Sequence, residues 1–273
     1  MLIRLLISLL LVIPISYAQA LRIVSLSPYL TESIMMLGGA DSLVGITTVS
    51  KRLFNLDREL IGDTININIE KIASLNPDIV LATPMNNIER VERIKSLGFK
   101  VKYFKLEKNF EDCCINFMEL AELIGKTEKA ESMIAQSEKR LEALSRRLKS
   151  KETKNIFIEI GYSPLITVGR DCYFDNLAEY AKTYNVAREI KSGFFRVIRE
   201  EILRLDPEYI LVISEDYPAS FKKWRGYKFL TAVKNNNLIR LDGDNFSRPN
   251  PINFTEAAYM LAAKVYPELF NED

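Results

Sequence analysis

The chain of 273 residues contains no histidine, and this absence excludes several kinds of chemistry. Serine–histidine and cysteine–histidine nucleophilic sites cannot be built, and neither can a metal site with imidazole ligands. Cysteine is scarce as well: Cys113, Cys114 and Cys172 lack the separated pairs that zinc sites use. We therefore expect no metal, no cofactor and no catalytic residues of these types, and we interpret the three cysteines as structural.

An excess of charge of either sign is also missing, since 37 lysines and arginines face 36 aspartates and glutamates. This balance argues against a nucleic acid or an anionic membrane surface as partner. Beyond residue 20 there is no apolar run long enough to cross a bilayer, and there is no low-complexity tract. About 250 residues then remain, enough for two modest hydrophobic cores or one large core.

The first 20 residues have the pattern of a secretory signal peptide. Arg4 supplies the positive charge, residues 5–15 are apolar, and Ala18 and Ala20 form an Ala-x-Ala cleavage signal. A transmembrane anchor is the weaker alternative because the apolar run is too short. No cysteine lies near the cleavage point, which argues against a lipoprotein. We expect cleavage after Ala20 and a mature periplasmic protein that begins at Leu21.

Two distant segments, residues 70–81 and 200–211, repeat one pattern. In each segment apolar residues three apart predict a short helix, and a run of aliphatic residues predicts a buried strand after it. A turn with a central proline separates the helix from the strand, and the proline ends the helix. The turn is Asn76-Pro77-Asp78 in one copy and Asp206-Pro207-Glu208 in the other. A repeat too remote for a solenoid period indicates two similar α/β lobes. Ligands often bind between domains, so we expect a cleft there.

Strands that alternate with helices predict a mostly parallel sheet covered on both faces. In the first lobe we expect strands at 22–26, 43–47, 79–82 and 99–104, helices at 31–37, 69–75 and 88–97, and a polar loop that contains Lys51 and Arg52. In the second lobe we expect a strand at 155–160 and a closing helix at 254–266.

Residues 127–149 contain neither glycine nor proline and predict one helix of about 23 residues, on the order of 35 Å long. Its apolar stripe suits a helix that rests on both lobes, although a surface helix of one domain has the same composition; the stripe consists of Met133, Leu141, Leu144 and Leu148. The predicted fold is α/β, with two Rossmann-like lobes joined by this helix and a ligand cleft between them. The predicted boundaries are 1–20 for the signal peptide, 21–125 for the first lobe, 126–150 for the connecting helix and 151–273 for the second lobe. A disulfide to Cys172 would have to join the lobes, so we do not expect it.

The whole mature chain resembles the substrate-binding proteins of ABC importers for cobalamin and ferric siderophores, in which two α/β lobes are joined by one rigid helix. Five segments carry the resemblance: residues 22–32 (RIVSLSPYLTE), 69–78 (IEKIASLNPD), 96–101 (SLGFKV), 164–170 (PLITVGR) and 248–251 (RPNP). The second lobe resembles the cobalamin binders somewhat more than the others, through Ile158-Glu159-Ile160 followed by the Pro-Leu-x-Thr-x-Gly run of residues 164–169.

The resemblance implies that one acidic residue on each lobe pairs with arginines of the membrane permease. The positions that match are Glu89 and Glu200, with neighbouring Glu92 and Glu201 as substitutes. Glu200 begins a predicted helix, where the helix dipole favours a carboxylate. An ordinary exposed glutamate is the alternative for each.

Loops at the carboxyl ends of the strands should line the ligand cleft. The residues that we assign to it are Ser27, Pro28, Tyr29, Pro84, Met85, Tyr162, Phe194, Phe195, Asn245, Phe246 and Arg248. Aromatic and apolar groups with a few polar ones suit a large, flat ligand such as a corrinoid. Alternatively, Tyr29 or Tyr162 coordinates haem iron and Arg248 meets the negative charge of a haem or siderophore. Core packing is the alternative for each aromatic residue taken alone. We place Trp224 on a surface helix, outside the cleft.

The function that follows is a monomeric periplasmic binding protein that captures a cobalamin-type corrinoid, or an iron siderophore or haem, and delivers it to an ABC permease. The competing hypothesis is an exported α/β enzyme that uses Asp63, Asp78 or Asp242 as acid or base. No phosphate loop, nucleophile elbow or metal cluster supports an enzyme, and turn patterns make Asp63 and Asp78 capping residues. A metal-ion binder is disfavoured because such sites are typically built from histidine.

Overall fold

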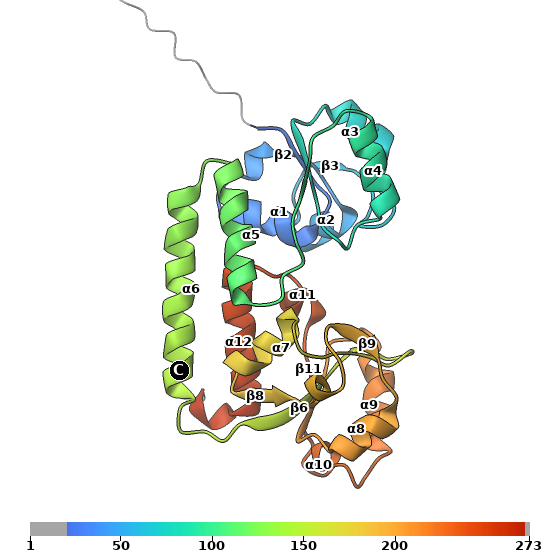
Figure 1. Cartoon of the computed structure of the whole chain (residues 1–273), viewed down its shortest axis with the longest axis vertical. Coiled ribbons are helices and arrows are strands. Elements are labelled where there is room, and N and C mark those ends of the chain that lie inside the picture. The colour runs from blue at the N-terminus through green and yellow to red at the C-terminus, as the bar shows by residue number, and fades with distance from the viewer. Residues whose placement is uncertain (1–20, 271–273) are drawn as a thin grey trace, which may run out of the picture.

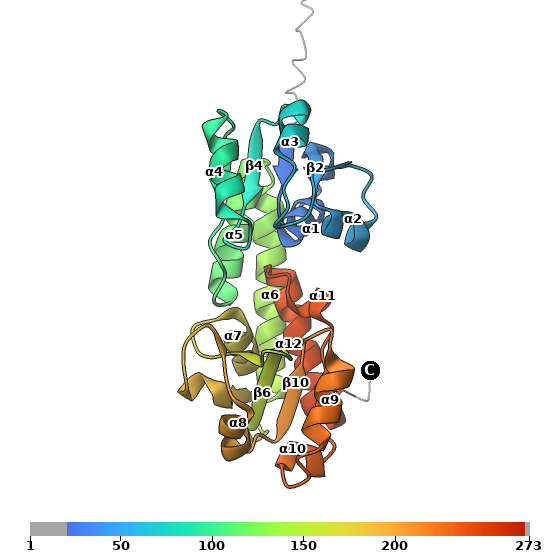
Figure 2. The ribbon, with the colours of Figure 1, turned by 90° about the vertical axis from the view of Figure 1, so that its right-hand side faces the viewer.

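The computed structural model describes residues 21–270, so the expected signal peptide, residues 1–20, lies outside the described residues. Two α/β lobes are joined by one long helix, α6 (Thr127–Arg147), which runs along both of them (Figures 1 and 2). This architecture confirms the predicted fold class.

The sheet of the first lobe is entirely parallel, with strand order β3-β2-β1-β4-β5. Its central strands are aliphatic and buried because helices cover both faces of the sheet. The strands are β1 (Ile23–Ser25), β2 (Leu43–Ile46), β3 (Glu59–Leu60), β4 (Ile79–Ala82) and β5 (Val101–Tyr103). The helices are α1 (Pro28–Met36), α2 (Thr48–Phe54), α3 (Ile69–Leu75), α4 (Ile88–Ser96) and α5 (Phe110–Leu123), with a 3-10 turn at Ala40–Ser42.

The sheet of the second lobe has the order β11-β10-β6-β7-β9, and β8 also pairs with β6. β7 is antiparallel to both of its neighbours, so this sheet is mixed. The strands are β6 (Lys154–Gly161), β7 (Ile166–Val168), β8 (Thr183–Asn185), β9 (Phe194–Arg196), β10 (Tyr209–Val212) and β11 (Leu238–Arg240). The helices are α7 (Tyr173–Tyr180), α8 (Arg199–Leu205), α9 (Tyr217–Arg225), α10 (Thr231–Lys234), α11 (Gly243–Phe246) and α12 (Pro251–Val265), with 3-10 turns at Val186–Glu189 and Pro267–Leu269.

The segment expected as a polar loop after β2 is the helix α2. Its N-cap is Thr47, whose side chain accepts a hydrogen bond from the backbone N–H of Ser50 at 3.1 Å. Lys51 and Arg52 are exposed on this helix. The loop prediction was wrong because so short a helix buries too few side chains to produce an apolar period.

The two repeat segments have the same backbone conformation. α3 ends at Asn76 with φ 43° and ψ 61°, and α8 ends at Asp206 with φ 42° and ψ 62°. Both residues are in the left-handed region, which asparagine and aspartate tolerate better than most residues. The following proline prevents the helix from continuing, and a buried strand starts within three residues in each lobe.

The acidic residue after each proline ties its strand to the central strand of the sheet. Asp78 accepts a hydrogen bond from the backbone N–H of Arg22 at 2.7 Å, and its own N–H donates to the Arg22 carbonyl at 2.9 Å. Glu208 makes the same pair of bonds with Asn155, both at 2.9 Å. The repeat is therefore a structural unit that fixes β4 against β1 and β10 against β6.

Helix α6 contributes side chains to the cores of both lobes. Ala130 and Met133, in its first half, pack in the first-lobe core. Leu141, Leu144 and Leu148, at its other end, pack in the second-lobe core. The apolar stripe predicted from the sequence therefore bridges the lobes, as expected for a connecting helix.

Helices α5 and α12 strengthen this bridge. Phe117 and Leu120 of α5 belong to the first-lobe core, whereas Phe110 and Cys113 belong to the second-lobe core. Phe254 of α12 packs against Phe110 with a ring-centroid distance of 5.2 Å. Figure 1 shows both helices lying along α6, so three helices hold the two lobes together.

Trp224 is buried, contrary to the surface position expected for it. Its side chain is fully enclosed and its Nε1–H donates to the carboxylate of Glu159 at 2.7 Å. The indole also packs edge-on against Phe157 at 5.8 Å. The surrounding run of lysine and arginine suggested exposure, but α9 turns only its basic face outward while the indole fills the core.

The three cysteines are free. Cys113 and Cys172 are buried in the second-lobe core, and Cys114 is half-buried beside it. Burial raises the pKa of the Cys114 thiol to about 12 and that of Cys172 to about 11. Thiols with raised pKa values are poor nucleophiles, which agrees with a structural role.

Glycine substitutions at the two left-handed positions should have different effects on stability. Asn76→Gly is expected to change the free energy of unfolding by less than about 0.5 kcal/mol, because glycine adopts this conformation without strain. Asp206→Gly should cost about 1–2 kcal/mol, because the Asp206 carboxylate also accepts bonds from the backbone N–H of Thr231 at 2.8 Å and its hydroxyl at 2.7 Å. Urea denaturation measures both, and equal effects would contradict the assignment.

Candidate functional site

The carboxyl ends of the two sheets face each other. Glu32 lies in α1, which follows the carboxyl end of β1, and Arg248 follows β11 and α11. Their side chains form an ion pair across the lobes at 3.0 Å, and the Asn253 amide also donates to Glu32 at 2.6 Å. The ligand edge of an α/β sheet is the carboxyl edge, so the facing edges are the candidate ligand site.

On the first-lobe edge the predicted ligand residues divide into exposed and buried ones. Pro84 and Met85 are exposed after β4, with Met85 66% exposed. Pro28 is half-buried at the start of α1. Ser27 and Tyr29 are buried, so their side chains belong to the packing of the lobe.

On the second-lobe edge, strand geometry separates Phe194 from Phe195. Phe194 is 51% exposed, whereas Phe195 packs in the core, because successive side chains of a strand point to opposite faces. Tyr162 is half-buried in the turn after β6. Phe246 is fully enclosed in the second-lobe core, and the side chain of Asn245 is not among the described ones. Phe195 and Phe246 thus do not present their rings at the surface, contrary to their assignment to the cleft.

The guanidinium of Arg248 makes its contacts at the junction of the lobes. Besides its ion pair with Glu32, its Nε–H donates to the Asp244 carbonyl at 2.5 Å, and its guanidinium lies over the ring of Phe54 at 5.4 Å. Burial raises the pKa of Glu32, and the charge of Arg248 and the bond from Asn253 oppose this shift. The guanidinium therefore positions the lobes rather than standing open to an anionic ligand.

Sequence reasoning missed a buried polar cluster at the junction of the lobes. Glu107 precedes α5 and is only 3% exposed, and one of its oxygens accepts a hydrogen bond from Asn116 at 2.6 Å. Its other oxygen and the hydroxyls of Tyr29 and Tyr173 are also enclosed, and the Tyr29 hydroxyl lies close enough to the Glu107 carboxyl to influence its pKa. Burial raises the pKa of the Glu107 carboxyl to about 7. No sequence signal marks this cluster, because its members come from three distant elements.

The two predicted docking glutamates are exposed. Glu89 lies in the first turn of α4 and Glu200 in the first turn of α8, and neither makes an ion pair with another described residue. The two positions are not equivalent, because α8 precedes β10 whereas α4 follows β4. The repeat instead pairs Glu200 with Glu70, which is exposed in the first turn of α3.

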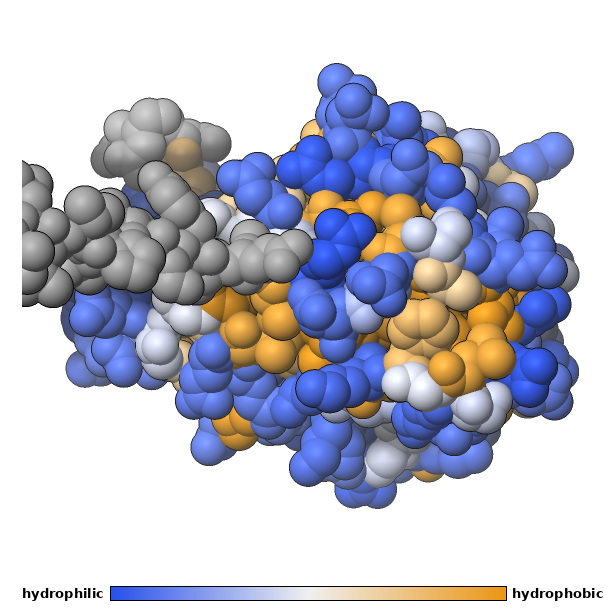
Figure 3. Space-filling model, turned by 90° about the horizontal axis from the view of Figure 1, so that it is seen from above, coloured by the Kyte–Doolittle hydropathy of each residue, from blue (hydrophilic) through white to orange (hydrophobic). Residues whose placement is uncertain are grey.

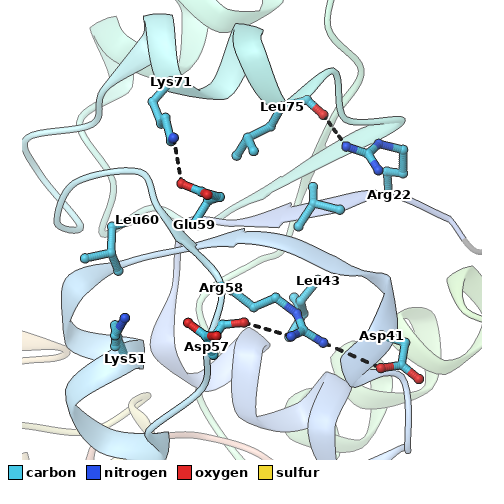
Figure 4. A pocket seen from close by; sticks show the side chains of 11 residues that line it. Arg22, Asp41, Leu43, Lys51, Asp57, Arg58, Glu59, Leu60, Lys71 and Leu75 are labelled. Carbon is cyan, nitrogen blue, oxygen red and sulfur yellow. Dashed lines mark hydrogen bonds and ion pairs between the residues drawn. The ribbon is translucent and has the colours of Figure 1, made fainter.

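A wide surface depression lies elsewhere. It encloses about 820 Å³ beside the amino ends of β2 and β3 (Figure 4). Two ion pairs cross it, that of Lys71 with Glu59 at 2.6 Å and that of Arg58 with Asp41 at 3.5 Å. Seen from above, the outer end of this lobe is largely hydrophilic, with apolar groups visible between charged ones (Figure 3). This depression lies beside the amino ends of its strands, away from the candidate site, and of its charged side chains Lys51 and Asp57 make no ion pair with another described residue.

Comparison with known proteins assigns the chain to a family. The family model for periplasmic binding proteins matches residues 23–245. The chain is a periplasmic binding protein of the ABC-importer type. The earlier resemblance is thereby confirmed, and because the members of this family are substrate-binding transport proteins, the chain is not an enzyme.

Three similar proteins illustrate the range of the family. An uncharacterized ABC transporter substrate-binding lipoprotein, YvrC of Bacillus subtilis, is 27% identical over 92% of this chain and 82% of its own length. The periplasmic vitamin B12 binding protein BtuF of Vibrio cholerae has a TM-score of 0.78 and 25% identity, covering 93% of this chain and 99% of that one. The apo heme-binding protein RhuT of Roseiflexus shares the fold, with a TM-score of 0.77, 20% identity and coverage of 90% and 99%.

The described part of this binding protein holds no group of acidic or cysteine side chains arranged to bind a metal ion. None of its described helices is long and apolar enough to cross a membrane. The three acids of the competing enzyme hypothesis, Asp63, Asp78 and Asp242, each accept a backbone hydrogen bond in a turn or at a helix start.

Replacing Glu107 should make the stability of the protein less dependent on pH. The Glu107 pKa is near 4.5 in the unfolded chain and about 7 in the folded one. Between these values the folded state keeps a proton that the unfolded state releases, so the free energy of unfolding falls as pH rises and levels off above pH 7. Glu107→Gln should therefore match the wild type at pH 4 and exceed its stability by up to about 3 kcal/mol at pH 8.

Guanidinium denaturation at a series of pH values measures this difference. Glu111→Gln is the matched control, since Glu111 is exposed on the adjacent helix. A difference between Glu107→Gln and the wild type that does not vary with pH would contradict the burial of an ionisable carboxyl at this position.

Proposed function

We propose that this binding protein captures a cobalamin-type corrinoid between its lobes and delivers it to an ABC permease. The observation that carries the proposal is the exposure of two apolar side chains, Met85 (66%) after β4 at the first-lobe edge and Phe194 (51%) on the second lobe, where its ring packs edge-on against Phe174 beside Tyr173. Exposed apolar side chains on opposing edges suit a large ligand with flat apolar faces. The similarity to a vitamin B12 binding protein supports the same ligand class.

The polar groups of the site favour an uncharged macrocycle over haem or a ferric siderophore. Recognition of an anionic ligand needs an available cation, and Arg248 is paired with Glu32. Ligation of haem iron needs an accessible donor, and the hydroxyl of Tyr29 is enclosed. Tyr162 is half-buried and supplies the iron ligand in the alternative function, a haem or siderophore binding protein of the same transport class.

Delivery requires export and contact with the permease. We propose that residues 1–20 are removed after Ala20 and that the mature protein acts as a periplasmic monomer. We propose that Glu200 and an acidic residue of the first lobe pair with basic residues of the permease. Glu89 is the residue expected from the family resemblance, and Glu70 is the equivalent of Glu200 in the repeat.

Titration of the mature protein with cyanocobalamin tests the ligand. Calorimetry should give saturable one-to-one binding, and Phe194→Ala should weaken it about tenfold or more because an aromatic contact is lost. Phe229→Ala is the matched control, since Phe229 is 59% exposed outside the facing edges. Failure to bind cyanocobalamin, together with a visible spectrum typical of coordinated haem after addition of hemin, would reassign the ligand.

Charge reversal tests the docking residues. Glu200→Arg combined with Glu70→Arg, and separately with Glu89→Arg, should leave ligand affinity unchanged, because these carboxylates make no ion pair within the described protein. The double variant that reverses the first-lobe residue used in docking should abolish uptake of radiolabelled cyanocobalamin in cells, since its arginines then face the basic residues of the permease. Uptake that survives both double reversals would remove the docking assignment.

A further inference from the structure

The repeat is broken at one exposed position that precedes the docking glutamate. The N-cap of α3 is Asn68, whose side chain accepts a hydrogen bond from the Lys71 backbone N–H at 2.9 Å. The equivalent N-cap of α8 is Ile198, which gives no side-chain cap and is 61% exposed. Asparagine is among the best N-cap residues and isoleucine among the worst. An exposed isoleucine therefore stabilises neither the helix nor the core.

Ile198 stands as a ridge between two surface recesses. One recess, of about 280 Å³, is lined by Leu165, Val197, Glu200 and Tyr227 together with Arg199 and Lys223. The other, of about 470 Å³, is lined by Pro164, Leu165 and Val197 together with Arg196 and Glu201. An apolar centre within a charged rim is the usual composition of a protein–protein contact.

The base of this surface is held firmly. The guanidinium of Arg199 lies over the rings of Tyr162 and Trp224, at 5.2 and 5.7 Å from their centroids. It also donates to the Tyr162 carbonyl at 3.1 Å. Trp224 in turn donates to the buried carboxylate of Glu159. A surface that is already ordered loses little conformational entropy when a partner binds.

We propose that the ridge of Ile198 and its two recesses form an apolar contact for the membrane permease. The inference rests on the proposed function and adds to it the chemistry of the partner. The permease segment that fits presents apolar side chains to the recesses and a basic side chain to Glu200 or Glu201, which make no ion pair within the described protein. Asn68, the equivalent residue of the first lobe, is a capping residue and gives no apolar contact at that position.

Photocrosslinking identifies the partner. The full mature chain carries p-benzoylphenylalanine at position 198, is expressed in its own cells, and is irradiated there, with mass spectrometry of the products. We expect a crosslink to the membrane-spanning subunit of an ABC importer, and none from the same group at position 115, since Ile115 is 50% exposed on α5 and lines neither recess. A crosslink only to a second copy of this chain, or no crosslink, would overturn the proposal.

Substitution of the ridge separates contact from stability. Ile198→Asn should raise the melting temperature by about 2–4 °C, because it restores the cap. It should weaken binding to the crosslinked permease, purified in nanodiscs, about tenfold, with cyanocobalamin affinity unchanged. Ile115→Asn, at an exposed position of α5 outside both recesses, is the control and should change neither binding constant.

The outcomes distinguish this inference from the proposed function. Permease binding that is unchanged by Ile198→Asn but lost on Glu200→Arg overturns the apolar contact and leaves docking intact. A chain that crosslinks the permease through position 198 but binds neither cyanocobalamin nor hemin supports the contact and removes the proposed ligand.

Discussion

The arrangement of this protein depends on the burial of one helix in two cores. The apolar stripe of α6 places Met133 in the first-lobe core and Leu144 in the second-lobe core. Because both side chains belong to one helix, a rotation that removed one of them from its core would also move the other. Phe254 of α12 adds a second tie, because its ring packs at 5.2 Å against Phe110 of α5, a helix that also contributes Phe117 and Leu120 to the first-lobe core. Moving the lobes apart would expose these rings to water, at a cost set by their buried area.

This constraint determines how the facing edges can bind a ligand. Since the lobes are joined by packed helices and by the ion pair of Glu32 with Arg248, the edges are positioned before a ligand arrives. Binding then requires little ordering of the protein, and more of the contact energy contributes to affinity. A protein that binds a large ligand in this way needs only small adjustments of exposed side chains such as Phe194 and Met85.

The repeat shows which parts of each lobe serve the fold and which are free to differ. Asp78 and Glu208 make the same backbone bonds, so both copies keep an acid there. At the N-caps of α3 and α8 no such constraint operates, and one copy has a capping asparagine while the other has an exposed isoleucine. Similar folds with different exposed residues allow one protein to present different surfaces to different partners.

The sequence by itself determined the two α/β lobes and the connecting helix, because the Asn76-Pro77-Asp78 and Asp206-Pro207-Glu208 turns and the stripe of α6 depend on local spacing. The family was indicated by the resemblance of short segments of the sequence. Only the tertiary structure decided which residues reach the surface. Arg248 meets Glu32 and Trp224 meets Glu159 across long stretches of chain, and Phe195 points inward because its strand places Phe194 outward. Such contacts join residues that no local period connects, so composition and spacing cannot reveal them.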